Sequence, residues 1–311
     1  ELLRTRRGAT RGWLKVQDGC DRKCSFCATR LARGESRSRA PDQVVAEALL
    51  LSGRHPELVV TGIHIGHYGK DLDPTWTLSR LVALLLDRVP DARFRLGSIE
   101  ATEVDDLLID LLATSGGRLA PHVHMPLQSG ADPVLKLMRR WHTREQYRVR
   151  VLELAERVSP LGLGADVITG FPGESEHDHD STRALIDELP FTYLHVFPFS
   201  PRDGTVAVRL PHPVPQRVSG QRSRELREIA QAKGREYRET RVGGSAEVVV
   251  EGDGGTALTG DYLRVGVGGA LRMAHHHEQT GTLERLPTGT LQGDADHLYI
   301  TLSQQPSVIS A

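Results

Sequence analysis

Two patterns of apolar and polar positions alternate along the chain from residue 12 to residue 197. Short apolar or β-branched runs predict strands, and each run is followed by a polar loop and then by apolar residues at helical spacing. The predicted strands are residues 12–17, 58–60, 93–96, 122–127, 164–168 and 193–197. One predicted helix starts at Pro41. The other predicted helices cover residues 78–86, 104–112, 133–138, 144–158 and 181–189.

Repeated strand–helix units imply parallel strands joined by right-handed crossovers. Closure of such a sheet into a barrel would place the loop after every strand at one end, where the active sites of these barrels lie. A doubly wound open sheet is the alternative, but the G-x-G-x-x-G fingerprint is absent after the first strand. The pattern therefore predicts an α/β fold with a partial (β/α)6 barrel over residues 1–240.

The chain changes character after Pro211, Pro213 and Pro215, where a long charged helix is predicted over residues 216–240. Five short strand-like runs separated by glycines follow, at residues 245–251, 257–259, 262–267, 281–286 and 298–302. They predict a small C-terminal β-barrel of the oligonucleotide-binding (OB-like) type over residues 241–311. A β-sandwich or a capping sheet with no role in nucleic-acid binding is the alternative.

The only three cysteines, Cys20, Cys24 and Cys27, lie within one short segment that follows the first predicted strand. An odd number of cysteines is not a disulfide framework, and three thiolates so close in sequence converge most naturally on one metal centre. Structural zinc sites usually add a second distant pair of cysteines, which this chain lacks. The spacing favours an iron–sulfur cube with one open iron. A zinc site completed by histidine, or three small buried loop residues, are the alternatives.

Charge is balanced over the whole chain, with 39 basic and 40 acidic side chains, and so indicates no partner by itself. Its distribution is uneven, because residues 4–39 carry a net charge of +8 and residues 217–241 carry +4. Two basic segments suit the docking of an anionic polymer, and ordinary solvated faces are the alternative. No apolar run approaches the roughly 20 residues that span a bilayer, so we expect a cytoplasmic location and no membrane partner.

Several loop segments together resemble one family, the radical S-adenosylmethionine methylthiotransferases, over almost the whole chain. They are the C-x3-C-x2-C motif with residues 32–34 and 37–39, then residues 61–64, 66, 68–69, 98–100, 126–130, 135–136, 138–140, 166–168, 170–174 and 195–200. Residues 62–64, 99–101 and 194–197 are most similar to the bacterial branch that acts on threonylcarbamoyladenosine in tRNA. Sister branches modify isopentenyladenosine in tRNA or an aspartate of a ribosomal protein.

The resemblance implies one 4Fe–4S cluster on Cys20, Cys24 and Cys27, with S-adenosylmethionine chelating the open iron through its amino and carboxylate groups. Reduction by a protein such as flavodoxin or ferredoxin would yield a 5′-deoxyadenosyl radical. That radical would abstract hydrogen from C2 of the adenosine at position 37 in the tRNA anticodon stem-loop, and a methylthio group would replace the hydrogen. No catalytic side chain beyond the cluster ligands is implied, and the terminal β-module resembles the RNA-binding TRAM domain.

The family also carries an N-terminal domain whose three further cysteines hold a second 4Fe–4S cluster. This chain starts at Glu1 and has no cysteine to substitute for them, so we expect it to lack that domain. A non-catalytic RNA-binding module, which would hold no cluster, is the remaining alternative.

Loop residues at the predicted strand ends are the candidates for binding S-adenosylmethionine. They are Thr61, Gly62, Ser98, Glu100, Gln128, Ser129 and Gly170. Serine, threonine and glutamate also cap the helices that follow, which is the alternative role for several of them.

Other polar and aromatic side chains have two interpretations each. His64, His122, His124 and His195 lie near strand ends, and we expect polar core or loop histidines rather than a metal site because no pair has the spacing of a zincin motif. His275, His276 and His277 are expected in a solvated loop. Arg33, Arg37 and Arg39 are either phosphate contacts or ordinary surface residues. Trp141 and Phe26 are expected to pack rather than to stack on a base.

Overall fold

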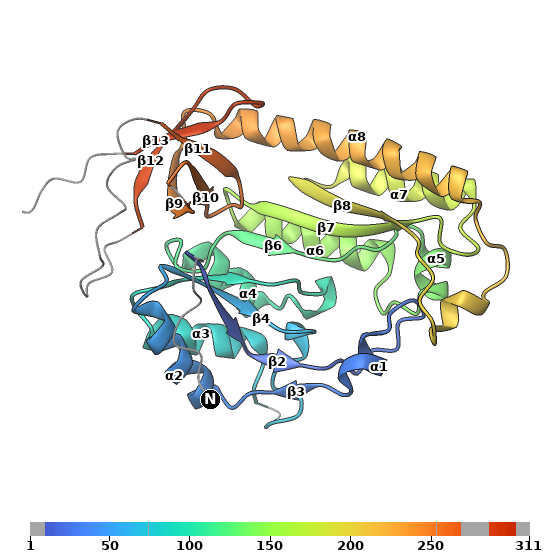
Figure 1. Ribbon diagram of the computed structural model, residues 1–311, viewed down its shortest axis with the longest axis horizontal. Coiled ribbons are helices and arrows are strands. Elements are labelled where there is room, and N and C mark those ends of the chain that lie inside the picture. The colour runs from blue at the N-terminus through green and yellow to red at the C-terminus, as the bar shows by residue number, and fades with distance from the viewer. Residues whose placement is uncertain (1–9, 74, 253, 269–285, 303–311) are drawn as a thin grey trace, which may run out of the picture.

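The computed structural model describes residues 10–73, 75–252, 254–268 and 286–302 (Figure 1). Six parallel strands form the centre of the larger part. They are β1 (Gly12–Lys15), β4 (Glu57–Thr61), β5 (Arg93–Leu96), β6 (His122–His124), β7 (Gly162–Thr169) and β8 (Tyr193–Pro198). Hydrogen bonding gives the orders β1-β4-β5 and β6-β7-β8, and single bridges at Phe94–Leu119 and Ser98–His124 join the two groups. The predicted partial barrel is confirmed.

The barrel is open on one side. Within the described residues, no hydrogen-bonded pairing joins β8 to β1. On β7, Leu163, Ala165 and Val167 are fully buried in the apolar core that the outer helices share, so the alternate residues of the strand face the barrel interior. The opening therefore exposes the inner face of the edge strands, where Trp13 and Phe197 are 47% and 51% exposed.

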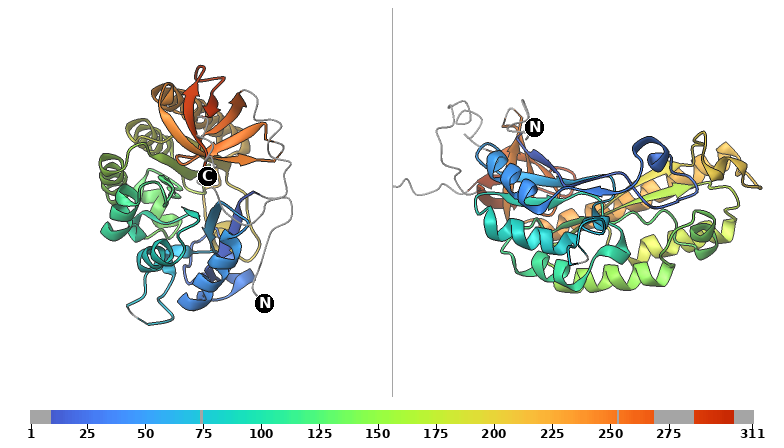
Figure 2. Two further views of the ribbon diagram at one scale, coloured as in Figure 1. Left: turned by 90° about the vertical axis from the view of Figure 1, so that its left-hand side faces the viewer. Right: turned by 90° about the horizontal axis from the view of Figure 1, so that it is seen from below.

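Helices cover the outer face of the sheet, as Figure 2 shows for α3, α4 and α6. The longer helices are α2 (Pro41–Ser52), α3 (Leu78–Arg88), α4 (Asp106–Thr114), α6 (Arg144–Arg157), α7 (Glu176–Glu188) and α8 (Gln216–Arg241). Short helices are α1 (Thr29–Arg33) and α5 (Asp132–Leu137), and 3-10 turns occupy η1 (Ile65–His67), η2 (Ala101–Glu103) and η3 (Val206–Arg209).

Helix starts follow the capping side chains more closely than the apolar pattern. The Asp105 side chain accepts a hydrogen bond from Leu108 N–H, so α4 starts at Asp106 and not at residue 104 as predicted. A capping box at Ser175 and Asp178 starts α7 five residues before the predicted start at residue 181. The polar first turn of α7 hides this start from the apolar pattern.

The first predicted strand, residues 12–17, is in fact two elements. After β1 the chain leaves the sheet, and β2 (Gln17–Asp18) pairs antiparallel with β3 (Arg37–Ser38). Buried Gln17 explains the break, because its Oε1 accepts hydrogen bonds from the N–H groups of Ile63 and His64 at 3.1 and 2.8 Å. These two hydrogen bonds fix Gln17 beside the turn after β4, and the chain continues from there into the cysteine segment.

The C-terminal part is a closed five-stranded barrel in the order β10-β11-β13-β12-β9. Its strands are β9 (Ser245–Glu251), β10 (Thr256–Thr259), β11 (Arg264–Gly268), β12 (Thr288–Gln292) and β13 (Tyr299–Leu302). The small barrel is as predicted, but β12 lies beyond the predicted strand at residues 281–286, which falls outside the described residues apart from Leu286. The histidines at 275–277 also lie outside them.

The small barrel packs against the amino-terminal ends of the six parallel strands, at the end of the molecule opposite α1 and α5 (Figure 1). Arg95 donates hydrogen bonds to the carbonyls of Gly260 and Thr259, both at 2.9 Å, and buried Glu57 binds Arg95 at 2.8 Å. The rings of His122 and Tyr262 stack with centroids 4.1 Å apart. The strand ends that carry the cysteine segment remain on the other side.

No helix among the described residues is long and apolar enough to cross a membrane.

Candidate metal centre

The three cysteines lie in a loop between β2 and α1, with Cys20 and Cys24 half-buried and Cys27 exposed, and none forms a disulfide. Backbone hydrogen bonds fix the loop at Cys20, whose N–H donates to Gly34 O at 3.0 Å, and at Ser25, whose N–H donates to Met138 O at 3.0 Å. Gly19 has φ of +71°, and a Cβ there would lie 1.8 Å from the Glu35 carbonyl oxygen. The loop is thus held in one conformation with its thiols available.

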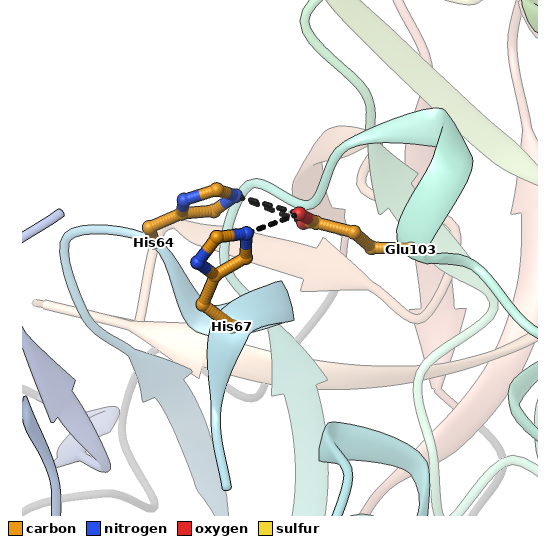
Figure 3. A group of neighbouring side chains, drawn as sticks. All are labelled: His64, His67 and Glu103. Atoms are coloured by element: carbon orange, nitrogen blue, oxygen red, sulfur yellow. Dashed lines mark hydrogen bonds and ion pairs between the residues drawn. The ribbon is translucent and has the colours of Figure 1, made fainter. Parts of the chain in front are cut away.

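His64, His67 and Glu103 form a cluster (Figure 3), and His64 of this cluster contacts Cys20. The Nδ1 atom of His64 lies 3.5 Å from Cys20 Sγ, and its Nε2 lies 2.9 Å from Glu103 Oε1. His67 stacks on His64 with ring centroids 4.0 Å apart and places its Nε2 3.3 Å from the same carboxylate oxygen. Arg22 also binds this carboxylate, with its Nη2 atom 3.2 Å from Glu103 Oε1.

This cluster sets the charge of the groups beside Cys20. Burial lowers the pKa of His64, but hydrogen bonds to Cys20 and Glu103 raise it to about 9. Burial opposes the ionised form of Glu103, yet hydrogen bonds from His64 and His67 hold its pKa below the ordinary value. Burial opposes ionisation of Cys20, but the hydrogen bond and charge of His64, together with a backbone hydrogen bond from Arg22, lower its pKa overall. A thiolate, the form that binds metal, is favoured at Cys20.

Cys24 has a different neighbour. Arg140 Nη1 lies 3.8 Å from Cys24 Sγ, and the same guanidinium is ion-paired with Glu100. Burial raises the pKa of Cys24, and Arg140 opposes that shift only in part. The Trp141 ring lies against two guanidinium groups, with the Cζ atoms of Arg22 and Arg140 at 3.8 and 4.5 Å from its centroid.

The seven candidate cofactor-binding residues lie at the carboxyl ends of β4 to β7, at the same end of the barrel as the cysteine loop. They are Thr61, Gly62, Ser98, Glu100, Gln128, Ser129 and Gly170. Several already have protein partners. Ser129 Oγ accepts from Ala131 N–H at 3.2 Å and lies 3.3 Å from Thr182 Oγ1. The Gly170 N–H donates to Glu174 at 2.5 Å.

Backbone conformation marks two of these positions. Gln128 has φ of +67°, uncommon for a residue with a side chain, and Gly170 has φ of +72°. A Cβ at Gly170 would lie 2.4 Å from Ser219 Oγ, so this turn requires glycine. Ser98 is exposed, whereas Glu100 is only 9% exposed.

Sequence reasoning missed Glu103, His67 and Arg140 as neighbours of the thiols. Glu103 belongs to η2 and lies 83 positions after Cys20 in the numbering, so no local motif connects them. Of the three arginines after the loop, Arg39 is bound to Glu47 at 2.8 Å, whereas Arg33 and Arg37 are exposed.

The Radical SAM superfamily model matches residues 14–186, which include the cysteine loop and strands β4 to β7. The chain belongs to the radical SAM superfamily. Membership implies a 4Fe–4S cluster and S-adenosylmethionine, and three free cysteines on a fixed loop, one with a lowered pKa, are a donor set that fits such a cluster.

Curated relatives narrow the comparison. The chain is 38% identical over 251 residues to the threonylcarbamoyladenosine tRNA methylthiotransferase MtaB of Rickettsia prowazekii (strain Madrid E), covering 78% of this chain and 58% of the relative. It is 36% identical over 258 residues to the tRNA-2-methylthio-N(6)-dimethylallyladenosine synthase of Bacillus pumilus (strain SAFR-032), covering 81% and 50%. The match therefore spans between half and three-fifths of the length of these relatives.

A solved structure supports the fold alone. Coproporphyrinogen III oxidase (HemN) from Escherichia coli, a radical SAM enzyme, matches with a TM-score of 0.54 and 19% identity over 73% of this chain and 53% of that one.

Proposed function

We propose that this chain is the radical-generating core of a methylthiotransferase that modifies C2 of N6-threonylcarbamoyladenosine at position 37 of tRNA. The observation that carries the proposal is the loop of Cys20, Cys24 and Cys27, fixed at the carboxyl ends of the barrel strands and supported by His64. Among the relatives, the MtaB proteins of Rickettsia prowazekii and Bacillus subtilis (strain 168), at 38% and 40% identity, favour threonylcarbamoyladenosine as the substrate.

In this proposal Cys20, Cys24 and Cys27 hold the 4Fe–4S cluster. Together with S-adenosylmethionine, the bound cluster would supply one-electron chemistry. The protein residues around the cluster would position S-adenosylmethionine and exclude water. His64 keeps Cys20 ionised, Arg140 places positive charge beside Cys24, and Thr61, Gly62, Ser98, Glu100, Gln128, Ser129 and Gly170 line the proposed S-adenosylmethionine site.

We further propose that residues 1–240 are the radical SAM core and residues 241–311 a TRAM-like domain that binds the tRNA anticodon stem-loop. Packing of the small barrel against the core through Arg95 and Tyr262 supports one rigid surface for RNA. A reductant such as flavodoxin or ferredoxin would supply electrons. The second 4Fe–4S cluster of such enzymes would be held by protein outside this chain.

A second candidate substrate is isopentenyladenosine. The dimethylallyladenosine synthase of Bacillus pumilus aligns over 81% of this chain, slightly more than the MtaB proteins do. Its lower identity, 36%, makes it the weaker candidate.

The test uses the full-length protein that contains this chain, reconstituted with iron and sulfide without oxygen. It is incubated with S-adenosylmethionine, a reductant and anticodon stem-loops that carry threonylcarbamoyladenosine, isopentenyladenosine or adenosine. We expect the mass of a methylthio group to be added to the first RNA, and no modification by the Cys20→Ala variant. Modification of the second RNA alone, or of a ribosomal protein alone, would contradict the proposed substrate.

The chain by itself gives a narrower expectation. Reconstituted under reduction, it should cleave S-adenosylmethionine without methylthiolation of RNA. A protein that retains as much iron after Cys20→Ala as before would contradict the cluster assignment, and would favour an RNA-binding module without catalysis.

A further inference from the structure

A continuous chain of hydrogen bonds crosses the barrel interior from β6 to β8. Tyr193 Oη lies 2.8 Å from His122 Nε2 and 3.0 Å from His124 Nδ1. His124 Nε2 lies 3.2 Å from Asp166 Oδ2, and Asp166 Oδ1 lies 3.2 Å from His195 Nδ1. Three neighbouring strands thus contribute to one polar chain that the proposed cluster chemistry does not use.

Strand register builds this chain. Asp166 and His195 are direct partners in the β7–β8 pair, and His124 is the partner of Gly164, two residues before Asp166. Gly164 is essential to the arrangement, because a Cβ there would lie 2.0 Å from Tyr193 Cζ. The missing side chain lets the tyrosine ring cross β7 and bring its hydroxyl to the two histidines of β6.

The proton positions follow from three of these groups, Asp166, His122 and Tyr193. Burial opposes ionisation of Asp166, but hydrogen bonds from His124 and His195 hold its pKa below the ordinary value, so the carboxylate accepts from both rings. Burial and nearby Arg95 keep the pKa of His122 well below its usual range, so this ring is neutral. Burial raises the pKa of Tyr193, which therefore keeps its proton.

One assignment with every ring neutral satisfies all four contacts. His122 Nε2–H donates to the tyrosine oxygen, the tyrosine O–H donates to His124 Nδ1, and His124 Nε2–H donates to Asp166. His195 donates its Nδ1–H to the same carboxylate. Because Nδ1 carries the proton in this contact, Nε2 is the hydrogen-bond acceptor of the neutral His195 ring.

His195 is the exposed end of this chain of hydrogen bonds. Its side chain is 55% exposed, compared with 27% for Asp166 and 9% for His124. Phe197 lies beside it on the inner face of β8, with ring centroids 6.3 Å apart and a side chain that is also exposed. An unprotonated nitrogen next to an exposed aromatic ring, inside an open barrel, is suited to a flat base that bears an N–H group.

We infer that His195 is a specificity-determining residue whose Nε2 atom accepts a hydrogen bond from an N–H group at or beyond N6 of the adenine that is modified. The inference rests on the proposed function, because it takes the substrate to be an N6-substituted adenosine in RNA. Asp166 is the positioning residue that fixes the tautomer, and Phe197 offers a face for stacking.

A divalent ion is the competing explanation for the same residues. One atom each of His124, Asp166 and His195 lie within 4.8 Å of one another, close enough to share an ion. Hydrogen bonds among these three side chains already account for their geometry without one. A stoichiometric ion that survives treatment with a chelator would make His195 a metal ligand and overturn the inference.

The first test measures the tautomer of His195 by nitrogen NMR of the whole chain, with a His195→Gln sample to assign the signals. We expect the proton on Nδ1 in the unaltered protein. In Asp166→Asn, whose amide can donate to His195 Nδ1, we expect the proton on Nε2. A proton on Nε2 of the unaltered protein would overturn the inference, and a merely structural role for Asp166 would not exchange the two nitrogens.

The second test measures RNA affinity. Two anticodon stem-loops are compared, one with N6-methyladenosine, which has one N–H, and one with N6,N6-dimethyladenosine, which has none. The unaltered chain should prefer the first by about 2- to 10-fold, as expected for one hydrogen bond. His195→Ala should lose that preference, His195→Gln should keep part of it through its amide oxygen, and the exposed control His177→Ala, on α7 and outside the small barrel, should keep it all. Threonylcarbamoyl RNA with and without methylation at N6 shows which N–H is bound.

The outcomes separate this inference from the proposed function. Equal preference in the unaltered chain and in His195→Ala overturns the inference alone. Absence of any RNA binding by the unaltered chain contradicts the proposed function as well.

Discussion

His64 Nδ1 lies 3.5 Å from Cys20 Sγ, so the first thiol of the cysteine loop is paired with a side chain from the turn after β4. The other ring nitrogen of His64 is bound to Glu103. A ligand whose partner is itself fixed in this way is restrained in orientation as well as in charge.

Replacing His64 should therefore weaken the cluster without removing a ligand. We expect His64→Phe, which keeps a ring but has no N–H, to hold iron about 10- to 100-fold less tightly, as is typical when a partner of a metal ligand is lost. Loss of a hydrogen bond to a cluster thiolate should also lower the reduction potential. Iron and sulfide analysis after competition with a chelator, and a potentiometric titration, measure the two effects.

The control for this variant is His297→Ala, because His297 is exposed and distant in sequence from the cysteine loop. It should match the unaltered protein in both measurements. Equal iron retention by His64→Phe and the control would show that the His64–Cys20 contact does not support the cluster.

Glu57 should be a large contributor to stability. It is fully buried and binds Arg93 at 2.6 Å and Arg95 at 2.8 Å. Glu57→Gln leaves both guanidinium groups buried without a counter-charge, which typically lowers the free energy of unfolding by about 3–5 kcal/mol. Denaturant unfolding measures the change. Glu188→Gln, which breaks a half-exposed pair with Arg148, is the matched control and should have little effect. Similar losses in both variants would contradict the role of Glu57.

Asp261 should make the free energy of unfolding depend on pH in the acid range. Its carboxylate accepts from Tyr237 Oη at 2.6 Å and from Arg241 Nε at 2.8 Å, which ties α8 to the loop after β10. Burial raises the pKa of Asp261, but Arg241 and the hydrogen bonds lower it below 3.8 overall. A lowered folded-state pKa means that the stabilisation is complete above pH 3.8 and is lost as the pH falls through the folded value.

Comparison with Asp261→Asn isolates this effect. The difference in unfolding free energy between the two proteins should be constant from neutral pH down to about pH 4 and should narrow below it. Unfolding by denaturant at a series of pH values measures it. A difference that stays constant through the acid range would indicate that Asp261 is not ionised in the folded protein.

Local patterns predicted the parts of this protein that depend on neighbours in sequence. The six strands follow from their apolar runs, and the cysteine loop follows from three thiols between residues 20 and 27. The partners of those thiols could not be predicted in the same way. Glu103 meets His64 because Val60 and Leu96 are paired in the β4–β5 register and η2 turns back toward the loop. Register is set by packing of the whole sheet and not by either strand alone.

The same limit applies inside the barrel. His122, His124 and His195 were expected to be polar core or loop residues, and two of them are buried. That they form one chain depends on Tyr193 crossing over Gly164, a contact between two strands that are 29 positions apart. A glycine in a strand signals close approach of another group, but the sequence does not identify which group approaches.

Gly164→Ala tests this contact. The added Cβ would lie 2.0 Å from Tyr193 Cζ, so the ring must move and its hydroxyl must leave His122 and His124. We expect the free energy of unfolding to fall by about 1–3 kcal/mol, as for other overpacked sites, and Tyr193 to lose its hydrogen bonds. Denaturant unfolding measures the first effect, and NMR of the two histidine rings measures the second. Gly53→Ala is the matched control, because φ there is −64° and the nearest atom to an added Cβ is 3.8 Å away. Unchanged ring signals in Gly164→Ala would mean that the position of the Tyr193 ring does not depend on the glycine. The proposed role of Gly164 in the chain of hydrogen bonds would then be wrong.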